Sequence, residues 1–253
     1  EEFGIIVGFD WSPDSKSIAF WRLDQSNVPK IKIAKWDSLY FNFLEMHYPK
    51  VGAKNSIVKI GVVNIDDGNT QWMALGDETD IYIPRIKFTN EPNILSVQRL
   101  NRLQNKLEFL LYNVKSGRGD LLFNETDSAW VDVNDNLYFL QDNKRMIWTS
   151  ERDGFNHLYF YDLKKKLVSQ ITKGNWEVNE LFSVDEKNEL IYFTANERGT
   201  IYKDLYSINF NGENLKRITE LSGYHSINFS SNNEYFIDVF SRASSLPSTV
   251  LCK

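Results

Sequence analysis

The sequence predicts an all-β protein. Short runs that alternate apolar and polar residues recur along the chain, separated by Asp, Asn and Gly turns, whereas long helical patterns are scarce. Aromatic residues make up 14% of the 253 residues and hydrophobic residues 42%, which favours many short strands with one buried and one hydrated face. One turn motif, in addition, returns at a nearly constant spacing.

This recurring motif consists of two or three strand residues, an Asn or Asp, an apolar residue and a turn. Its copies are centred at Asn64, Asn113, Asp162 and Asn209, so that successive copies lie 49, 49 and 47 residues apart. A period of 40–50 residues with about four strands is typical of a β-propeller blade. We expect the motif to join strands three and four of each blade, with the Asx side chain accepting local backbone N–H groups.

A second motif keeps the same spacing and is expected to join strands one and two. It places Ser or Thr after an aromatic or apolar residue, followed by an acidic or Asn turn and a strand. Its copies lie at residues 12–14, 183–185 and 230–232, with looser versions at 89–91 and 133–135.

The repeats predict a single partial β-propeller over residues 1–253, with about four and a half four-stranded blades. The predicted blades cover residues 11–82, 83–126, 127–174 and 175–222, and residues 223–253 form a half blade. The first blade is about 25 residues longer than the period allows, which predicts an extended arm inserted at residues 24–58.

The arm is a candidate binding element, because insertions in repeat proteins map to loops that often contact partners. It carries Trp36, Leu39, Tyr40, Phe41 and Phe43, which would expose apolar surface unless something covered them. The alternative is that the arm packs back on its own blade.

Charge and composition exclude several classes of protein. The net charge of −5, from 29 Lys and Arg against 34 Asp and Glu, argues against nucleic-acid binding. The chain has no run of about 18 apolar residues, so no membrane span is expected. Its single cysteine, Cys252, excludes an internal disulfide. Because the chain starts without Met in mid-pattern, we expect it to be an excised piece of a longer protein.

No catalytic residue or metal ligand set is predicted from the motifs. The chain contains no Gly-x-Ser-x-Gly elbow, and therefore no visible hydrolase nucleophile. The three histidines, His47, His157 and His225, are far apart in sequence and show no metal-ligand spacing. We expect no cofactor.

Three stretches carry a resemblance to a known family. They are residues 48–55 (Tyr-Pro-Lys-Val-Gly-Ala-Lys-Asn), residues 148–159 and residues 171–178. Together they resemble the dipeptidyl peptidase IV group of the prolyl oligopeptidase family, in its bacterial type. The resemblance implies an enzyme with an N-terminal eight-bladed propeller and a C-terminal α/β-hydrolase domain that holds Ser, Asp and His. This chain would be an open arc from the later half of the propeller, and the catalytic triad would lie beyond Lys253.

The resemblance also implies a binding site at the start of the chain. Glu1 and Glu2, followed by Phe3-Gly4, are similar to the end of the family's Tyr-Glu-Glu-Glu helix, which binds the free α-amino group of the peptide substrate. An ammonium group entering a partly desolvated cavity needs paired anionic acceptors, because an unpaired buried charge is costly. Residues 130–135 lack the combination of an aromatic residue and an Arg that some members use along the extended subsites, so no binding role is assigned there.

These implications define the expected function. The chain would be the non-catalytic propeller portion of a serine exopeptidase that removes N-terminal Xaa-Pro or Xaa-Ala dipeptides, contributing amino-terminus recognition, access gating and dimerisation. Its partners would be the peptide N-terminus, the parent's hydrolase domain and, through the arm, a second copy. The resemblance implies a periplasmic, cell-envelope or secreted location. The alternative is a non-catalytic propeller that serves as a protein-interaction scaffold.

Overall fold

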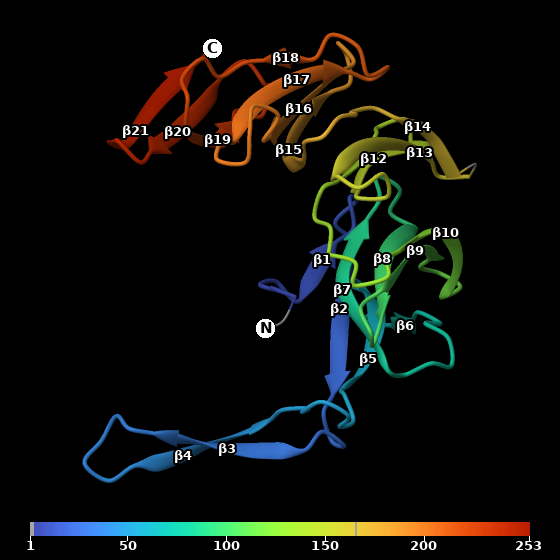
Figure 1. The fold of residues 1–253 in the computed structure, drawn as a ribbon. Helices are drawn as coiled ribbons and strands as arrows, with labels where there is room; N and C mark the ends of the chain where they lie inside the picture. The colour runs from blue at the N-terminus through green and yellow to red at the C-terminus, as the bar shows by residue number, and fades with distance from the viewer. Residues whose placement is uncertain (1–2, 165) are drawn as a thin grey trace. The chain divides into compact units, whose positions relative to one another are not determined.

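The computed structural model describes residues 3–164 and 166–253. Every regular element of these residues is a β-strand, and the strands within each sheet pair antiparallel (Figure 1). The chain divides into two compact units, Glu1–Val133 and Asn134–Lys253.

The first unit contains two four-stranded sheets and a separate hairpin. The first sheet has the order β1 (Phe9–Trp11), β2 (Ser17–Asp24), β5 (Ile57–Asn64) and β6 (Thr70–Trp72). The second has β7 (Ile81–Phe88), β8 (Ile94–Asn101), β9 (Lys106–Asn113) and β10 (Arg118–Thr126) as consecutive neighbours. Between β2 and β5 the chain forms the hairpin of β3 (Lys30–Lys35) and β4 (Asn42–His47), whose strands pair only with each other.

The second unit contains two further four-stranded sheets and one of three strands. Their strands are β11 (Leu137–Phe139), β12 (Arg145–Ser150), β13 (His157–Asp162) and β14 (Lys166–Gln170); then β15 (Val178–Asp185), β16 (Leu190–Ala195), β17 (Asp204–Asn209) and β18 (Lys216–Arg217); then β19 (Tyr224–Phe229), β20 (Phe236–Arg242) and β21 (Ser245–Cys252). Successive antiparallel four-stranded sheets in chain order are the pattern of a β-propeller, which confirms the predicted fold class.

The Asn-apolar-turn motif joins the third and fourth strand of each four-stranded sheet, as predicted. Asn64 Oδ1 accepts the amide of Asp66 at 2.9 Å, and Asp162 Oδ1 accepts that of Lys164 at 2.8 Å. Asn113 Oδ1 accepts two amides in the same way. The side-chain oxygen therefore accepts hydrogen bonds from backbone amides that the tight turn would otherwise leave unpaired.

The Ser-x-Asp motif joins strands one and two, with one exception. Ser12 Oγ donates to Asp14 Oδ1 at 2.7 Å and accepts the amide of Ser17 at 2.9 Å, which closes the turn between β1 and β2. The looser version at residues 133–135 was assigned wrongly, because it precedes β11 instead of following it. Asn134 accepts the hydroxyl of Thr149 at 2.9 Å and so ties this segment to β12.

The cores of the two units lie between successive sheets. In the first unit Ala19 and Ile60 of one sheet pack with Leu95 and Val97 of the next. In the second unit a corresponding cluster includes Leu158, Ile191 and Phe193, and a smaller one places Leu205 of β17 with Ile227 and Phe236 of the last sheet. Each sheet thus buries its faces against its neighbour within the unit, which is how blades are stabilised.

Candidate functional site

The predicted carboxylate pair, Glu1 and Glu2, lies outside the described residues, but the segment that follows it is fixed. Arg85 Nη1 donates to the carbonyl oxygen of Phe3 at 2.6 Å. The ring of Phe3 meets that of Tyr82 edge to face, with centroids 5.0 Å apart. Since Arg85 and Tyr82 both belong to β7, the second sheet of the first unit holds the residue next to the pair.

An irregularity in β7 presents these two side chains to the segment. The register of β7 against β8 shifts between Tyr82 and Arg85, and β-bulges of this kind re-aim side chains. Pro84, which has no N–H for the ladder, lies within the shift. The guanidinium of Arg102 lies 5.6 Å from the centroid of Tyr82 and pairs with Asp80 at 3.4 Å. Tyr82 is therefore in contact with both Phe3 and Arg102.

The chain then turns away from β7 and returns to it through β1. Gly4 has a φ of +59°, a conformation that L side chains rarely adopt. Ile6 is 95% exposed in the stretch that follows. Asp10, in β1, accepts the backbone amide of Phe88 at 2.7 Å and so attaches the first sheet to β7. The start of the chain is thus connected to β7 at two places, Phe3 and Asp10.

The arm exposes the aromatic side chains that the sequence singled out. Trp36 is 79% exposed, and Phe41 and Phe43 are 51% and 58% exposed. The ring centroids of Trp36 and Phe41 lie 5.2 Å apart, and those of Phe41 and Phe43 lie 5.5 Å apart. Leu39 and Tyr40 at the turn are also exposed. These five side chains, the arm cluster, contact one another or solvent, so the alternative that they pack back on their own blade is wrong.

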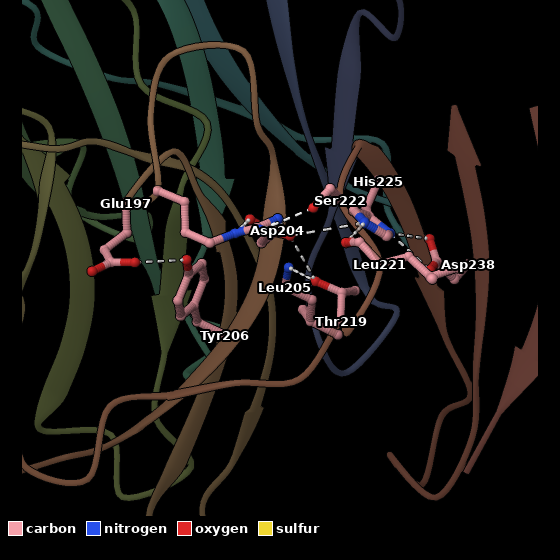
Figure 2. A network of polar contacts seen from close by, with 10 residues as sticks. Glu197, Asp204, Leu205, Tyr206, Thr219, Leu221, Ser222, His225 and Asp238 are labelled. Carbon is pink, nitrogen blue, oxygen red and sulfur yellow. Dashed lines mark hydrogen bonds and ion pairs between the residues drawn. The ribbon is translucent and has the colours of Figure 1, made fainter. Parts of the chain in front are cut away.

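A buried polar network in the second unit was not predicted from the sequence (Figure 2). Asp204, fully buried at the start of β17, accepts two hydrogen bonds from Arg198 at 2.8 and 2.9 Å. Thr219 donates to Asp204 at 3.1 Å and accepts the amide of Leu205 at 3.2 Å. His225, 1% exposed on β19, lies 2.8 Å from Asp238 of β20. Nε2 of His225 also lies 3.8 Å from Asp204 Oδ1, so the network joins the last two sheets of this unit.

Tyr206 and Arg198 continue the network at its outer side. The hydroxyl of Tyr206 donates to Glu197 Oε2 at 3.1 Å, and burial together with this carboxylate raises the pKa of Tyr206. The hydrogen bonds to Asp204 raise the pKa of Arg198. Arg198 Nη1 also donates to Ser222 Oγ at 3.2 Å. None of the sequence motifs includes Asp204, and the signal that could have identified it is an acidic residue at the head of an otherwise apolar strand.

The other two histidines have separate structural partners. His157 is fully buried, with its ring nitrogens 3.0 Å from Thr172 Oγ1 and 3.0 Å from the carbonyl of Gly174. His47 Nδ1 lies 2.8 Å from the carbonyl of Val28. Within residues 3–164 and 166–253, no three His, Cys, Asp or Glu side chains are grouped so that they could hold a metal ion. The same residues contain no helix that is long and apolar enough to cross a membrane.

Comparison with known proteins identifies the family. The model of the dipeptidyl peptidase IV (DPP IV) N-terminal region matches residues 1–247. The crystal structure of Porphyromonas gingivalis dipeptidyl peptidase 4 is similar with a TM-score of 0.90 and 33% identity, over 99% of this chain and 36% of that one. A putative dipeptidyl aminopeptidase IV from Bacteroides ovatus is similar with a TM-score of 0.89 and 26% identity, over 98% and 38% of the two chains.

Curated relatives give the same result. Probable dipeptidyl-aminopeptidase B of Aspergillus terreus is 28% identical over 255 residues, which cover 89% of this chain and 28% of the relative. Dipeptidyl peptidase 4 of Trichophyton equinum is 25% identical over 253 residues, with 94% and 32% covered. The chain belongs to the dipeptidyl peptidase IV N-terminal region family, and the predicted relationship is confirmed. It spans about a third of the length of these relatives.

Proposed function

We propose that this chain is the non-catalytic propeller portion of a serine-type dipeptidyl peptidase that removes Xaa-Pro or Xaa-Ala dipeptides from peptide N-termini. The observation that carries the proposal is the similarity to P. gingivalis dipeptidyl peptidase 4 over 99% of the chain. The parent protein would act outside the cytoplasm, in the periplasm, in the cell envelope or as a secreted enzyme. Its hydrolase domain would supply the nucleophile.

Within this enzyme, Glu1 and Glu2 would bind the free α-amino group of the substrate. Two carboxylates accept the N–H groups of an ammonium ion through charge-assisted hydrogen bonds, which are stronger than neutral ones. The contacts of Phe3 with Arg85 and Tyr82 support this role, because they hold the adjacent residue against β7. A recognition pair at a fixed distance from the nucleophile would limit cleavage to the second peptide bond.

The arm cluster would form part of a homodimer interface. Exposed contiguous aromatic surface of this kind marks interaction sites. Trp and Tyr, of which the cluster has one each, are enriched among the residues that dominate the energy of protein interfaces. A scaffold protein without catalytic activity would present the same surface, so the arm alone does not distinguish the two functions.

The activity is tested on the protein encoded by the complete reading frame. We expect cleavage of Xaa-Pro and Xaa-Ala chromogenic dipeptides, and no cleavage of their N-acetylated forms, because acetylation removes the ammonium charge. As a control, a peptide with a free N-terminus that carries its Pro at the third instead of the second position should not release a dipeptide. A reading frame that lacks a Gly-x-Ser-x-Gly motif after Lys253, or a protein that cleaves none of these substrates, would support the scaffold alternative.

A further inference from the structure

The turns that join the third and fourth strands dock on a neighbouring sheet in two places. In the second sheet of the first unit, Gly117 lies against the end of β6, where a side chain on it would overlap the carbonyl oxygen of Trp72. The amide of Ala74 donates to the carbonyl oxygen of Gly117 at 2.8 Å. In the second unit, a Cβ on Gly212 would lie 2.6 Å from the carbonyl oxygen of Ile171, which follows β14. The turn glycine therefore allows close approach to the outer strand of the sheet that precedes it in the chain.

An apolar residue at the start of each of these turns is buried between the same two sheets. Val114 is 8% exposed and belongs to the core cluster of the first unit, and Phe210 is 9% exposed and belongs to that of the second. The ring of Phe210 meets that of Phe160 of β13 with centroids 5.1 Å apart. Each docked turn thus makes two contacts, one from the glycine to the backbone of the neighbouring sheet and one from the apolar residue to the core.

The first sheet has the same turn, but there it is exposed. Gly68 has a φ of +71°, compared with +68° for Gly117, and each glycine amide donates to the Asn carbonyl four residues earlier at 2.9 Å. The amide of Ile65 donates to a carbonyl in the turn between the first two strands of its sheet, as that of Val114 does in the second sheet. However, Ile65 is 49% exposed, and no described atom lies within 4 Å of the position that a Cβ on Gly68 would take.

The face of the first sheet beside this turn is apolar and partly exposed. Ala19 of β2 packs in the core towards the second sheet, so the next residue, Phe20, faces the other way. Trp72 of β6 is 37% exposed and meets the ring of Phe20 edge to face, with centroids 5.7 Å apart. The other exposed aromatic side chains of this face are Phe9 and Trp11, both 47% exposed. Contiguous exposed apolar surface of this kind marks a docking site.

We infer that this face and the turn at residues 64–68, together the docking face, receive the outer strand of another four-stranded sheet of the complete protein. The carbonyl at the end of that strand would lie against Gly68, and an amide two residues further on would donate to the carbonyl of Gly68, as Ala74 does to Gly117. Ile65 would then be buried, as Val114 is. The two docked turns specify the occupant, because units of a repeat protein bury their faces against neighbouring units of the same kind.

This inference rests on the proposed function in one respect, since it takes the chain as part of a longer propeller. The chain covers 36% of the P. gingivalis relative, which leaves length for further sheets in a complete protein of that size. A second copy of the chain is the competing occupant of the docking face, and the experiment distinguishes the two.

Thiol labelling of the folded complete protein, read peptide by peptide by mass spectrometry, tests the docking face. Ile65→Cys should react more than about tenfold more slowly than Asp66→Cys, its exposed neighbour in the turn, because labelling requires the two sheets to part. Val114→Cys gives the rate for a docked turn. If Ile65→Cys reacts as fast as Asp66→Cys, the inference is wrong. Protection that disappears on dilution to the monomer would assign the face to a second copy and would also overturn it.

Substitution of Gly68 tests the close approach of the backbone. Asn tolerates a positive φ, so Gly68→Asn adds a side chain at little cost in backbone conformation. We expect it to lower the unfolding midpoint of the complete protein as much as Gly117→Asn does. Gly52→Asn is the matched control, because Gly52 has a φ of +77° and no described atom within 4 Å of its Cβ position. Equal midpoints for Gly68→Asn and Gly52→Asn would contradict the inference.

Neither measurement depends on peptidase activity. A complete protein that cleaves no dipeptide but protects Ile65→Cys would overturn the proposed function and support the docking face. An active peptidase in which Ile65→Cys is labelled freely would do the reverse.

Discussion

Arg85 contacts the residue next to the proposed carboxylate pair without being one of the proposed binding residues. Its guanidinium donates to the carbonyl of Phe3, the residue that follows the carboxylate pair. Arg85 belongs to none of the sequence motifs. The register shift in β7 directs its side chain to Phe3, and no sequence motif predicts that shift.

Arg85→Met in the complete protein is expected to raise the KM of a free dipeptide substrate about tenfold with little change in kcat, since it removes one charge-assisted hydrogen bond from the adjacent segment. Arg85→Lys should restore part of the loss. Arg145→Met is a control for the loss of an arginine, because Arg145 pairs with Asp142 and belongs to the second unit. If the KM is unchanged in Arg85→Met but raised in Glu2→Gln, Arg85 has no positioning role, whereas the proposed role of the carboxylate pair stands.

Glu108 makes the stability of the second sheet dependent on pH. Burial raises its pKa, but hydrogen bonds from Lys106 and Arg99 outweigh burial and leave the pKa below the ordinary value of 4.5. A lowered pKa contributes stability above that value, and the contribution is lost as the pH falls through the folded-state pKa.

Glu108→Gln should therefore lower the free energy of unfolding by about 1–3 kcal/mol at pH 7 and by much less at pH 3. Urea unfolding at the two pH values measures the difference. The exposed Glu213, exchanged for Gln, serves as control. An equal loss at both pH values would show that the charge of Glu108 is not what stabilises the sheet.

At the scale of elements, the turns were predictable because their chemistry is local. Asn64, Asn113 and Asp162 bind amides two or three residues away, so the sequence pattern alone defines the turn. Asn134 likewise accepts the amide of Asn136 two residues away, but it also binds Thr149 of another strand, which local reasoning could not detect.

The buried network could not be predicted for the same reason. Asp204, His225 and Asp238 meet only because three strands of two sheets come together. Each residue is unremarkable in its own stretch of sequence. The aromatic arm, in contrast, was found from the excess length of its blade, since an insertion changes a repeat period in a way that sequence shows directly.

If the proposed homodimer forms through the arm hairpin, the hairpin should control dimerisation without stabilising the fold. The double substitution Trp36→Ala with Phe41→Ala is expected to weaken the dimer of the complete protein about 30-fold or more, as for central interface residues. The unfolding midpoint should not change, since both side chains are exposed. Sedimentation velocity measures the effect, with the exposed Leu103→Ala as control. An unchanged dimer affinity would exclude the arm as part of the dimer interface.

At the scale of the molecule, the last sheet differs from the others because it has three strands. Within the part of the chain that the structure describes, β21 pairs only with β20 and leaves its outer edge unpaired, and Leu246 and Leu251 are 86% and 69% exposed. Open apolar edges promote pairing with another chain. We predict that the isolated 253-residue chain self-associates at this edge.

Leu251→Lys should reduce this self-association in light scattering, because a charged residue on an edge opposes strand pairing. Leu103→Lys, which places the same charge at an exposed site of the first unit, should not. A chain that stays monomeric at high concentration without any substitution would contradict the prediction.

We propose that Glu1 and Glu2 bind the amino terminus of the substrate in the complete protein. The most direct test compares kcat/KM of the complete protein and of Glu1→Gln and Glu2→Gln on a dipeptide substrate with a free amine. We expect kcat/KM to fall about 30- to 1,000-fold in each variant, because each substitution removes one partner of a desolvated charge pair. Activity that stays unchanged in both variants would contradict it.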